Sequence, residues 1–298
     1  MAITIIIIRV NDMNIKKVLL LMHIPKAAGT SFTAAVQNNF RKSESVNFAW
    51  QSSHERYPNN FFKRKKKREL AKYNFYSGHF IYGVHTKISR PCSYITMLRN
   101  PNERLISAYN YITTQSSYIN KYLPQVKRFT FDEFLFSKDI PNWHQLDNTQ
   151  TRFISGLDPK LKLRSEDLLV AKENLIKNID FFGITEEFDK SMILLKKDLN
   201  LKFLFYTRER VTKISKIDKL DHFIDLLENY NRLDNELYQY AKEIFNKRTK
   251  KISDYEMKKY SRLNTLYQRL CNVKQNRIIT TYYVILQKII HKVFGLRK

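Results

Sequence analysis

The order of apolar and polar positions places a short buried strand near the start of the chain. Residues Lys17–Ile24 form an apolar run with a charge in front and Pro25 behind, which is typical of a strand buried on both faces. The small residues Gly29–Ser31 follow, and Phe32–Phe40 then carries apolar residues at helical spacing. This pattern predicts a strand-to-helix turn, with a Thr or Ser side chain as the N-cap of the helix.

A second unit of the same kind begins at Cys92. The pattern predicts a strand over Cys92–Leu98, a turn over Arg99–Asn102 and a helix over Glu103–Ile112. Pro101 suits the opening of this helix, because the N–H that proline lacks would have no partner in the first turn. Two such units predict parallel strands in one sheet.

A third apolar run, Asp180–Ile184, predicts another strand, and Thr185 is the expected N-cap of a helix over Glu186–Leu199. Helical spacing of large apolar residues continues through Lys219–Glu228 and Leu233–Lys247, so the tail is expected to be mostly helical. The alternation of strands and helices favours an α/β fold, in which ligands bind at the carboxyl ends of the strands.

Composition indicates how many domains the chain forms and in which compartment it is expected. The chain has 298 residues, is 43% hydrophobic and contains no linker-like stretch or repeat, which favours one domain with appendages. Cys92 and Cys271 match no disulfide framework or zinc spacing. Ala2–Ile8 is too short to span a bilayer, and Ile278–Phe294 is interrupted by polar residues, as in a docking helix or, alternatively, a membrane-surface helix. We expect a cytoplasmic protein without a transmembrane segment.

The net charge of +25 indicates a polyanionic partner. Nucleic acid, anionic lipid, acidic polysaccharide and a multiply charged nucleotide all fit this charge. The densest run, Lys63–Arg68, is also compatible with an ordinary solvated surface. Charge alone does not choose among these readings.

The turn after the first strand has the chemistry of an anion site. A helix N-terminus offers unpaired N–H groups and a positive dipole end to a phosphate or sulfate, and Lys26 adds an ammonium group. The segment is not a Walker A loop, because the lysine precedes the glycine, and a kinase function is correspondingly disfavoured. An ordinary turn with a surface lysine is the alternative reading of this segment.

The segment His23–Ser31 reads His-Ile-Pro-Lys-Ala-Ala-Gly-Thr-Ser and resembles the 5′-phosphosulfate loop of the carbohydrate sulfotransferases, above all the heparan sulfate 2-O and 6-O branches and their bacterial relatives. The resemblance implies 3′-phosphoadenosine 5′-phosphosulfate (PAPS) as the sulfuryl donor and 3′-phosphoadenosine 5′-phosphate as the product. It implies that Lys26 contacts the phosphosulfate and its bridging oxygen. The remaining donor-binding positions of this loop are Ala27, Ala28, Gly29, Thr30 and Ser31.

The segment Leu98–Tyr109 resembles the 3′-phosphate motif of the same family. The resemblance assigns that phosphate to Arg99 and Ser107, and an arginine fork does match phosphate oxygens. Asn100 stands where the family usually has Asp, and it can still cap a helix. For Arg104 we expect a surface ion pair.

Three further segments, Asn148–Gly156, Phe181–Glu187 and Leu233–Phe245, are similar to the same enzymes, so about four-fifths of the chain is covered in order. The resemblance implies a P-loop-kinase-like three-layer fold, with a central parallel sheet flanked by helices and a helical C-terminal extension. It suggests a sulfotransferase domain over residues 1–250, with residues 251–298 as an extension packed on the same domain.

A general base for the acceptor hydroxyl is expected between the two phosphate motifs. Tyr76–His85 contains two candidates, since His79 follows a glycine as in the 2-O branch, whereas His85 lies in a motif like that of the 6-O branch. We favour His79, with His85 as the alternative and Glu55 as a third candidate. No metal is expected, because Lys26 and the other cations supply the positive charge.

The family's acceptor side is less well marked. Asn148, Gln150 and Arg152 could line the acceptor cleft or brace it, with bracing favoured for Asn148. Arg208 and Lys213 occupy a loop that in the family covers the nucleotide and touches acceptor. The leading hypothesis is a PAPS-dependent O-sulfotransferase acting on an anionic glycan, in a bacterial cytoplasm. No nucleic-acid partner is expected, and peripheral membrane contact stays open. The alternatives are a non-catalytic polyanion-binding or nucleic-acid-binding protein and a nucleotide-dependent kinase.

Overall fold

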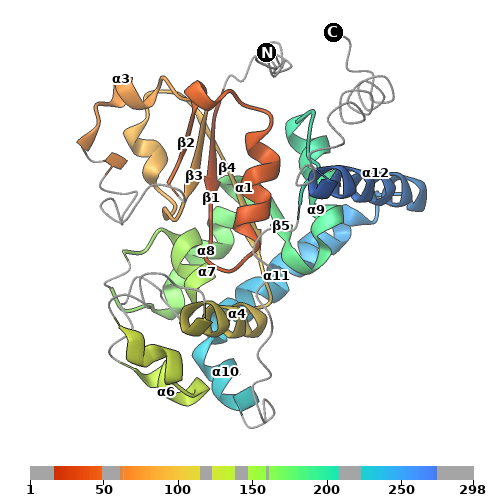
Figure 1. Cartoon of the computed structure of the whole chain (residues 1–298). Coiled ribbons are helices and arrows are strands. Elements are labelled where there is room, and N and C mark those ends of the chain that lie inside the picture. Colours follow the sequence, from red (N-terminus) through yellow and green to blue (C-terminus); the bar gives the residue numbers. More distant parts are fainter. Residues whose placement is uncertain are drawn as a thin grey trace.

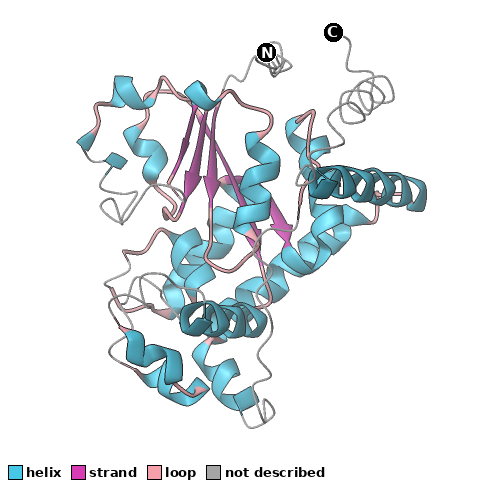
Figure 2. Ribbon diagram, viewed as in Figure 1, coloured by secondary structure: helices cyan, strands magenta, loops and turns pink. Residues whose placement is uncertain are grey.

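The computed structural model describes residues 17–48, 61–62, 64–114, 123–137, 147–158, 161–207 and 223–273. Its centre is a five-stranded parallel sheet flanked by helices (Figures 1 and 2). The strand order is β2-β3-β1-β4-β5. The strands are β1 (Val18–Met22), β2 (Ser45–Asn47), β3 (Phe75–Gly78), β4 (Cys92–Leu98) and β5 (Ile179–Ile184).

Helices follow or precede the strands along the whole described chain. Helices α8 and α9 both pack against β5, and α11 contacts α4, α7, α8 and α9. The helices are α1 (Gly29–Gln37), α3 (Lys67–Leu70), α4 (Pro101–Thr114), α6 (Phe131–Phe136), α7 (Thr149–Ser155), α8 (Ser165–Lys177), α9 (Phe188–Leu199), α10 (Ile224–Tyr230), α11 (Arg232–Thr249) and α12 (Asp254–Val273). The 3₁₀ turns are η1 (Lys42–Glu44), η2 (Val84–Lys87), η3 (Pro124–Arg128) and η5 (Thr185–Glu187).

The core explains why the apolar runs form central strands. Every residue of β1 is buried, as is every residue of β4 after Cys92, because these strands have neighbours on both sides and helices over the sheet. A second apolar cluster joins α4, α6 and α10 beyond the sheet, around Leu105, Phe134 and Leu227. The predicted α/β fold with a parallel sheet and a helical extension is thereby confirmed.

Several local predictions need correction. Helix α1 starts at Gly29 with Ala28 as its N-cap, and no side-chain oxygen of the described residues caps it, so the expected Thr or Ser cap is wrong. Thr185 does not cap α9 either, because it opens the turn η5 and Glu187 holds the N-cap position. The pattern also missed β2 and β3.

Because all five strands are parallel, their ends define two different edges of the sheet. The carboxyl edge is followed by the segments that begin at His23, Phe48, His79, Arg99 and Thr185. In Figures 1 and 2 the strand arrows run toward α4 and α7, whereas α3 lies at the opposite edge. The three motifs singled out in the sequence, at Lys26, His79 and Arg99, therefore share one edge.

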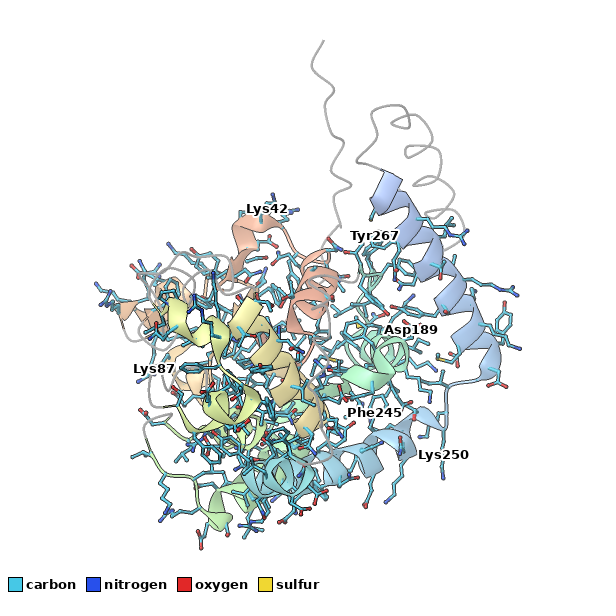
Figure 3. All side chains as sticks on the ribbon, turned by 60° about the horizontal axis from the view of Figure 1, so that its bottom comes forward. Lys42, Lys87, Asp189, Phe245, Lys250 and Tyr267 are labelled. Carbon is cyan, nitrogen blue, oxygen red and sulfur yellow. The ribbon has the colours of Figure 1, made fainter. Side chains whose placement is uncertain are left out.

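Helix α12 packs along α9. Its Tyr260 hydroxyl donates to the carbonyl of Leu204 at 2.8 Å, and its Asn264 side-chain oxygen accepts from the backbone N–H of Tyr206 at 2.9 Å. Tyr267 lies on the side of the helix that faces the body of the protein and packs its ring against Phe203 (Figure 3). Among the described residues, none of the helices combines the length and hydropathy that crossing a bilayer requires.

Candidate active site

The loop between β1 and α1 is shaped like an anion cradle. Lys26 and Ala28 both have left-handed backbone conformations, with φ of 65° and 55°, which non-glycine residues adopt only when the surroundings enforce it. Ala28 is the N-cap residue of α1, so the first N–H groups of the helix face the loop. Left-handed residues in a turn and a helix N-terminus are the two backbone arrangements that bind phosphate or sulfate in proteins.

His23 explains the glycine of this loop. A Cβ atom on Gly29 would come within 1.9 Å of His23 Cδ2, so only glycine allows the imidazole to pack against the first turn of α1. The side chain of His23 is buried. Gly29 is therefore fixed by packing, and its role toward a ligand is confined to its backbone N–H.

Arg99, directly after β4, connects the two phosphate motifs. Its Nη1 donates to the carbonyl oxygen of Lys26 at 3.2 Å, and its Nη2 lies 3.5 Å from a carboxylate oxygen of Glu103. The buried amide of Gln150 holds its backbone from both sides: Gln150 Oε1 accepts from the Arg99 N–H at 2.9 Å, and Nε2 donates to the Arg99 carbonyl at 2.8 Å. The guanidinium thus stands beside the loop of Lys26 on a rigidly held backbone.

The turn after Arg99 is capped as expected. Asn100 Oδ1 accepts from the backbone N–H groups of Asn102 and Glu103 at 3.0 and 3.1 Å, which supplies the cap of α4. Its own N–H donates to Glu186 Oε1 at 2.8 Å, which ties the turn to the end of β5. The asparagine therefore does the capping work of the aspartate that it replaces.

Arg104 was expected in an ion pair at the surface, but its side chain is fully buried, so the expected surface position is wrong. Burial lowers the pKa of its guanidinium, and the negative charge of Asp234 is the largest opposing effect. Asp234 is itself fully buried, and desolvation raises the pKa of its carboxyl group despite Arg104 and the hydrogen bonds it accepts. The opposite charges of these two buried residues, one on α4 and one on α11, attract each other.

Helix α4 also presents an aromatic ring to the candidate donor lysine. Lys26 Nζ lies 4.3 Å from the centroid of the Tyr111 ring, within the range of a cation–π interaction. Ser107 is half-buried one turn before Tyr111, and residues four apart lie on the same helix face. The face of α4 that carries Ser107 is therefore the face turned toward the loop of Lys26.

His79 has the hydrogen bonding of a base. Its Nδ1 lies 2.7 Å from the carbonyl oxygen of His23, and because a carbonyl only accepts, Nδ1 carries the proton and Nε2 keeps its lone pair. The pKa of His79 is lowered from its ordinary value because desolvation outweighs that hydrogen bond. The side chain nevertheless reaches solvent. His79 is thus a neutral, oriented and accessible imidazole beside the loop that contains Lys26.

His85 lies in the turn η2 and packs against β4. Its Nδ1 is 3.1 Å from the hydroxyl of Tyr94, which also accepts from the backbone N–H groups of Gly83 and His85. Tyr94 is the third residue of β4, four positions before its carboxyl end. Desolvation lowers the pKa of His85 as well, but its contacts are those of a turn packed on the sheet.

Arg152 makes its contacts inside the protein. Its Nη2 lies 2.9 Å from a carboxylate oxygen of Asp147, and its Nη1 donates to the carbonyl of Leu161 at 2.7 Å. Only 7% of the residue is exposed. These contacts favour bracing over the acceptor contact that the sequence suggested. Asn148 likewise braces, since its side chain bonds the backbone of Tyr230 and Asp234.

Three predicted site residues, Glu55, Arg208 and Lys213, lie outside the described residues, as does Lys63 at the start of the basic run. Within the described ranges, no group of three or more His, Cys, Asp or Glu side chains is arranged to hold a metal ion.

A family model described as "Sulfotransferase family" matches residues 11–241, which includes every strand of the sheet and the segments that contain Lys26 and Arg99. The chain belongs to the sulfotransferase family. As in the sequence-based prediction, the segments singled out for binding and chemistry lie at the carboxyl edge of the sheet of this family member.

The curated relatives of this chain have names that refer to heparan sulfate. Heparan-sulfate 6-O-sulfotransferase 3 of Mus musculus is 28% identical over 179 residues, covering 52% of this chain and 38% of that protein. Heparan-sulfate 6-O-sulfotransferase 2 of Homo sapiens is 28% identical over 188 residues, covering 53% and 30%. Heparan-sulfate 6-O-sulfotransferase 3-B of Danio rerio is 24% identical over 280 residues, covering 78% and 65%. The chain therefore spans less than two thirds of the length of each of these relatives.

Sequence reasoning missed three residues that shape this site and left a fourth, Gln150, open between lining the acceptor cleft and bracing it. His23 orients His79, Gln150 and Glu186 hold the backbone after β4, and Tyr111 faces Lys26. Gln150 and Glu186 do lie in segments that resemble the family, which was the one available signal. Their partners are 51 and 86 residues away in sequence, so spacing could not reveal the contacts.

Proposed function

We propose that this sulfotransferase moves the sulfuryl group of PAPS onto a hydroxyl of a carbohydrate. The observation that carries the proposal is the hydrogen bond from Arg99 to the carbonyl of Lys26, because it brings the two family phosphate motifs side by side at one edge of the sheet. A donor with phosphates at both its 5′ and 3′ positions needs two neighbouring anion sites of this kind. An ordinary βα turn has no need of the second.

The residues present fit such a donor. The backbone N–H groups of residues 27–31 would bind the 5′-phosphate, since the loop is left-handed at Lys26 and Ala28 and opens into α1. Arg99 and Ser107 would hold the 3′-phosphate. Lys26 would stabilise the negative charge that develops on the phosphate oxygen when the sulfur–oxygen bond breaks.

His79 would take the proton of the acceptor hydroxyl. The hydroxyl oxygen forms the new bond to sulfur, its proton passes to His79 Nε2, and the old bond from sulfur to the 5′-phosphate oxygen breaks. The orientation of His79 supports this role, because its other nitrogen is occupied by the carbonyl of His23. The position of His85 against Tyr94 makes it the weaker candidate.

The acceptor we propose is an anionic glycan. The curated relatives are named for heparan sulfate, and the net charge of +25 would attract a polymer of negatively charged sugars. Sulfation site and sugar identity are set by contacts to the acceptor.

Calorimetric binding of 3′-phosphoadenosine 5′-phosphate and of AMP tests the donor assignment. We expect the 3′-phosphate to increase the affinity of the wild type by tenfold or more, on the order of 1.4 kcal/mol, and Arg99→Ala to remove most of that gain. Arg232→Ala, which removes an exposed arginine in a helical ion pair, is the matched control and should behave as wild type. Equal affinity for the two nucleotides in the wild type would refute the proposal, and preference for ATP with magnesium would favour a kinase.

A further inference from the structure

The amino edge of the sheet, opposite the candidate active site, collects a second charged surface. Arg41 and Lys42 precede β2, Arg64–Arg68 and Lys72 precede β3, and Lys87 precedes β4. All of these side chains are exposed. We call them the amino-edge basic surface. Lys42 and Lys87 are labelled at the outside of the protein in Figure 3.

Backbone and side-chain contacts join the three segments into one surface. The backbone N–H of Asn74 donates to the carbonyl of Glu44 at 2.8 Å, which links the segment of Lys42 to the one before β3. Arg90 Nη1 donates to the carbonyl of Ala71 at 3.0 Å, and Ser89 Oγ lies 3.5 Å from the carbonyl of Lys67. Cations that are more than twenty residues apart in sequence therefore share one face.

The charge of this surface is poorly balanced by neighbouring carboxylates. Within the three described segments 41–44, 64–72 and 87–90, nine exposed cations face two carboxylates. Glu44 pairs with Arg41 at 3.7 Å, and Glu69 accepts from the backbone N–H of Lys66. Most of the lysines thus lack an acidic neighbour in these segments, and their mutual repulsion is relieved by binding a polyanion.

The kind of polyanion follows from what the surface does not expose. Among the described residues, the exposed large apolar side chains lie elsewhere, for example Phe136, Leu169, Ile176 and Tyr255. Insertion into a bilayer uses apolar or aromatic side chains beside the cations, and stacking of single-stranded bases uses exposed aromatic rings. The described part of the amino-edge basic surface can therefore bind mainly through charge, which suits a hydrophilic polyanion.

We propose that the amino-edge basic surface is a second binding site for an anionic polysaccharide, separate from the site of sulfuryl transfer. The choice of a polysaccharide over duplex nucleic acid rests on the proposed function, whose acceptor is such a polymer. The strands separate this surface from Lys26, Arg99 and His79, so it contacts sugars away from the reacting hydroxyl. Holding the polymer there raises its local concentration at the active site.

Binding to dextran sulfate, with uncharged dextran as the ligand control, tests the surface directly. The variant Lys65→Gln/Lys67→Gln/Lys87→Gln should bind dextran sulfate about tenfold more weakly at physiological salt and show a shallower salt dependence, because fewer counterions are displaced. The matched control is Lys247→Gln/Lys250→Gln/Lys251→Gln, which removes three exposed charges near the end of α11. It should retain wild-type binding.

A second variant separates the composite surface from the basic run alone. Lys42→Gln/Lys87→Gln leaves residues 64–68 intact and should still weaken dextran sulfate binding several-fold. Equal losses in the control triple variant, or no loss in this double variant, would overturn the proposal. Tighter binding to duplex DNA or to anionic vesicles than to dextran sulfate would overturn the choice of partner. Affinity for 3′-phosphoadenosine 5′-phosphate reports on the proposed function separately and should be the same in all of these variants.

Discussion

His79 is neutral because of its surroundings, and this sets an expected pH dependence. Its pKa lies below the ordinary 6.5, so Nε2 loses its lone pair to a proton only at acid pH. We expect kcat/KM for the donor, which reports the enzyme without bound donor, to be constant near neutrality and to fall as pH drops through the lowered pKa, with a midpoint below 6.5. The measurement is a pH profile of kcat/KM for sulfuryl transfer at low donor concentration. A midpoint above 6.5 would contradict the assignment.

Removal of the imidazole should separate binding from chemistry. His79→Ala should lower kcat by about 10²- to 10⁴-fold, as expected for the loss of a general base, with unchanged affinity for 3′-phosphoadenosine 5′-phosphate. His85→Ala is the matched control. A larger loss in His85→Ala would transfer the role to that residue, and near-normal turnover in both variants would turn attention to Glu55.

Tyr111 is expected to position the ammonium of Lys26 through the face of its ring, 4.3 Å away. A cation–π contact of about 0.5–2 kcal/mol corresponds to a loss of about 2- to 30-fold in kcat for Tyr111→Leu. Tyr111→Phe keeps the ring and should transfer at nearly the wild-type rate, measured at donor saturation. If the phenylalanine variant loses as much activity as the leucine variant, the hydroxyl or the packing of Tyr111 is what matters.

At the level of single residues, the sequence identified those that resemble family motifs. It did not identify the residues whose contacts hold them in position. Arg99 stands directly after β4, and Lys26 lies in the loop after β1, so both belong to motifs that can be read locally. The contact of Arg99 with the carbonyl of Lys26 joins residues 73 positions apart, and only the fold makes them neighbours. The burial of Arg104 was missed for the same reason, because its counter-charge, Asp234, comes from a distant helix.

Among the elements, α7 depends on α11 for its N-terminus. Asp234 accepts from the backbone N–H groups of Gln150 and Thr151 at 3.0 and 2.7 Å and from the Thr151 hydroxyl at 2.8 Å, and it faces the charge of buried Arg104. Asp234→Ala should lower the free energy of unfolding by about 3–5 kcal/mol, because buried Arg104 loses a nearby negative charge and two buried N–H groups lose their acceptor. Urea unfolding measures this loss.

The control for Asp234 lies on the same helix. Glu236→Ala removes a half-exposed carboxylate that pairs with Arg232 and Lys172, and it should change the free energy of unfolding by less than about 1 kcal/mol. Asp234→Asn keeps an acceptor without the charge and should fall between the two. A loss in Asp234→Ala no larger than that in Glu236→Ala would show that the buried carboxylate contributes little to stability.

The bounds of the helices and strands show where local sequence patterns predict well and where they fail. The strand at Cys92–Leu98 was predicted to the residue, because a long apolar run between turn residues has one good interpretation. The start of α1 was misplaced, since His23 packing on Gly29 lets the helix begin earlier than its Thr and Ser residues suggest. The strands β2 and β3 have only three and four residues, too few for a period to register.

For the whole molecule, the parallel order of the strands is what turns separate motifs into one site. Parallel strands end at a common edge, so the segments after β1, β3 and β4 must meet there, and the basic segments before β2, β3 and β4 must gather at the other. The sequence predicted the first consequence through the alternation of strands and helices. It gave no sign of the second, because the basic segments are separated by strands that the pattern did not predict.

Helix α12 is expected to stabilise the segment that leaves the sheet domain at Tyr206. Asn264 is 3% exposed, and its side-chain oxygen accepts from the N–H of Tyr206 at 2.9 Å. Asn264→Ala leaves that buried N–H without this acceptor, so we expect a loss of about 1–3 kcal/mol in the free energy of unfolding, measured by urea titration. Tyr255→Ala, at a residue of the same helix that is 71% exposed, should stay within about 0.5 kcal/mol of wild type. A single unfolding transition shifted as a whole would mean that α12 folds with the sheet, whereas a separate early transition in Asn264→Ala would mean that the helix unfolds on its own.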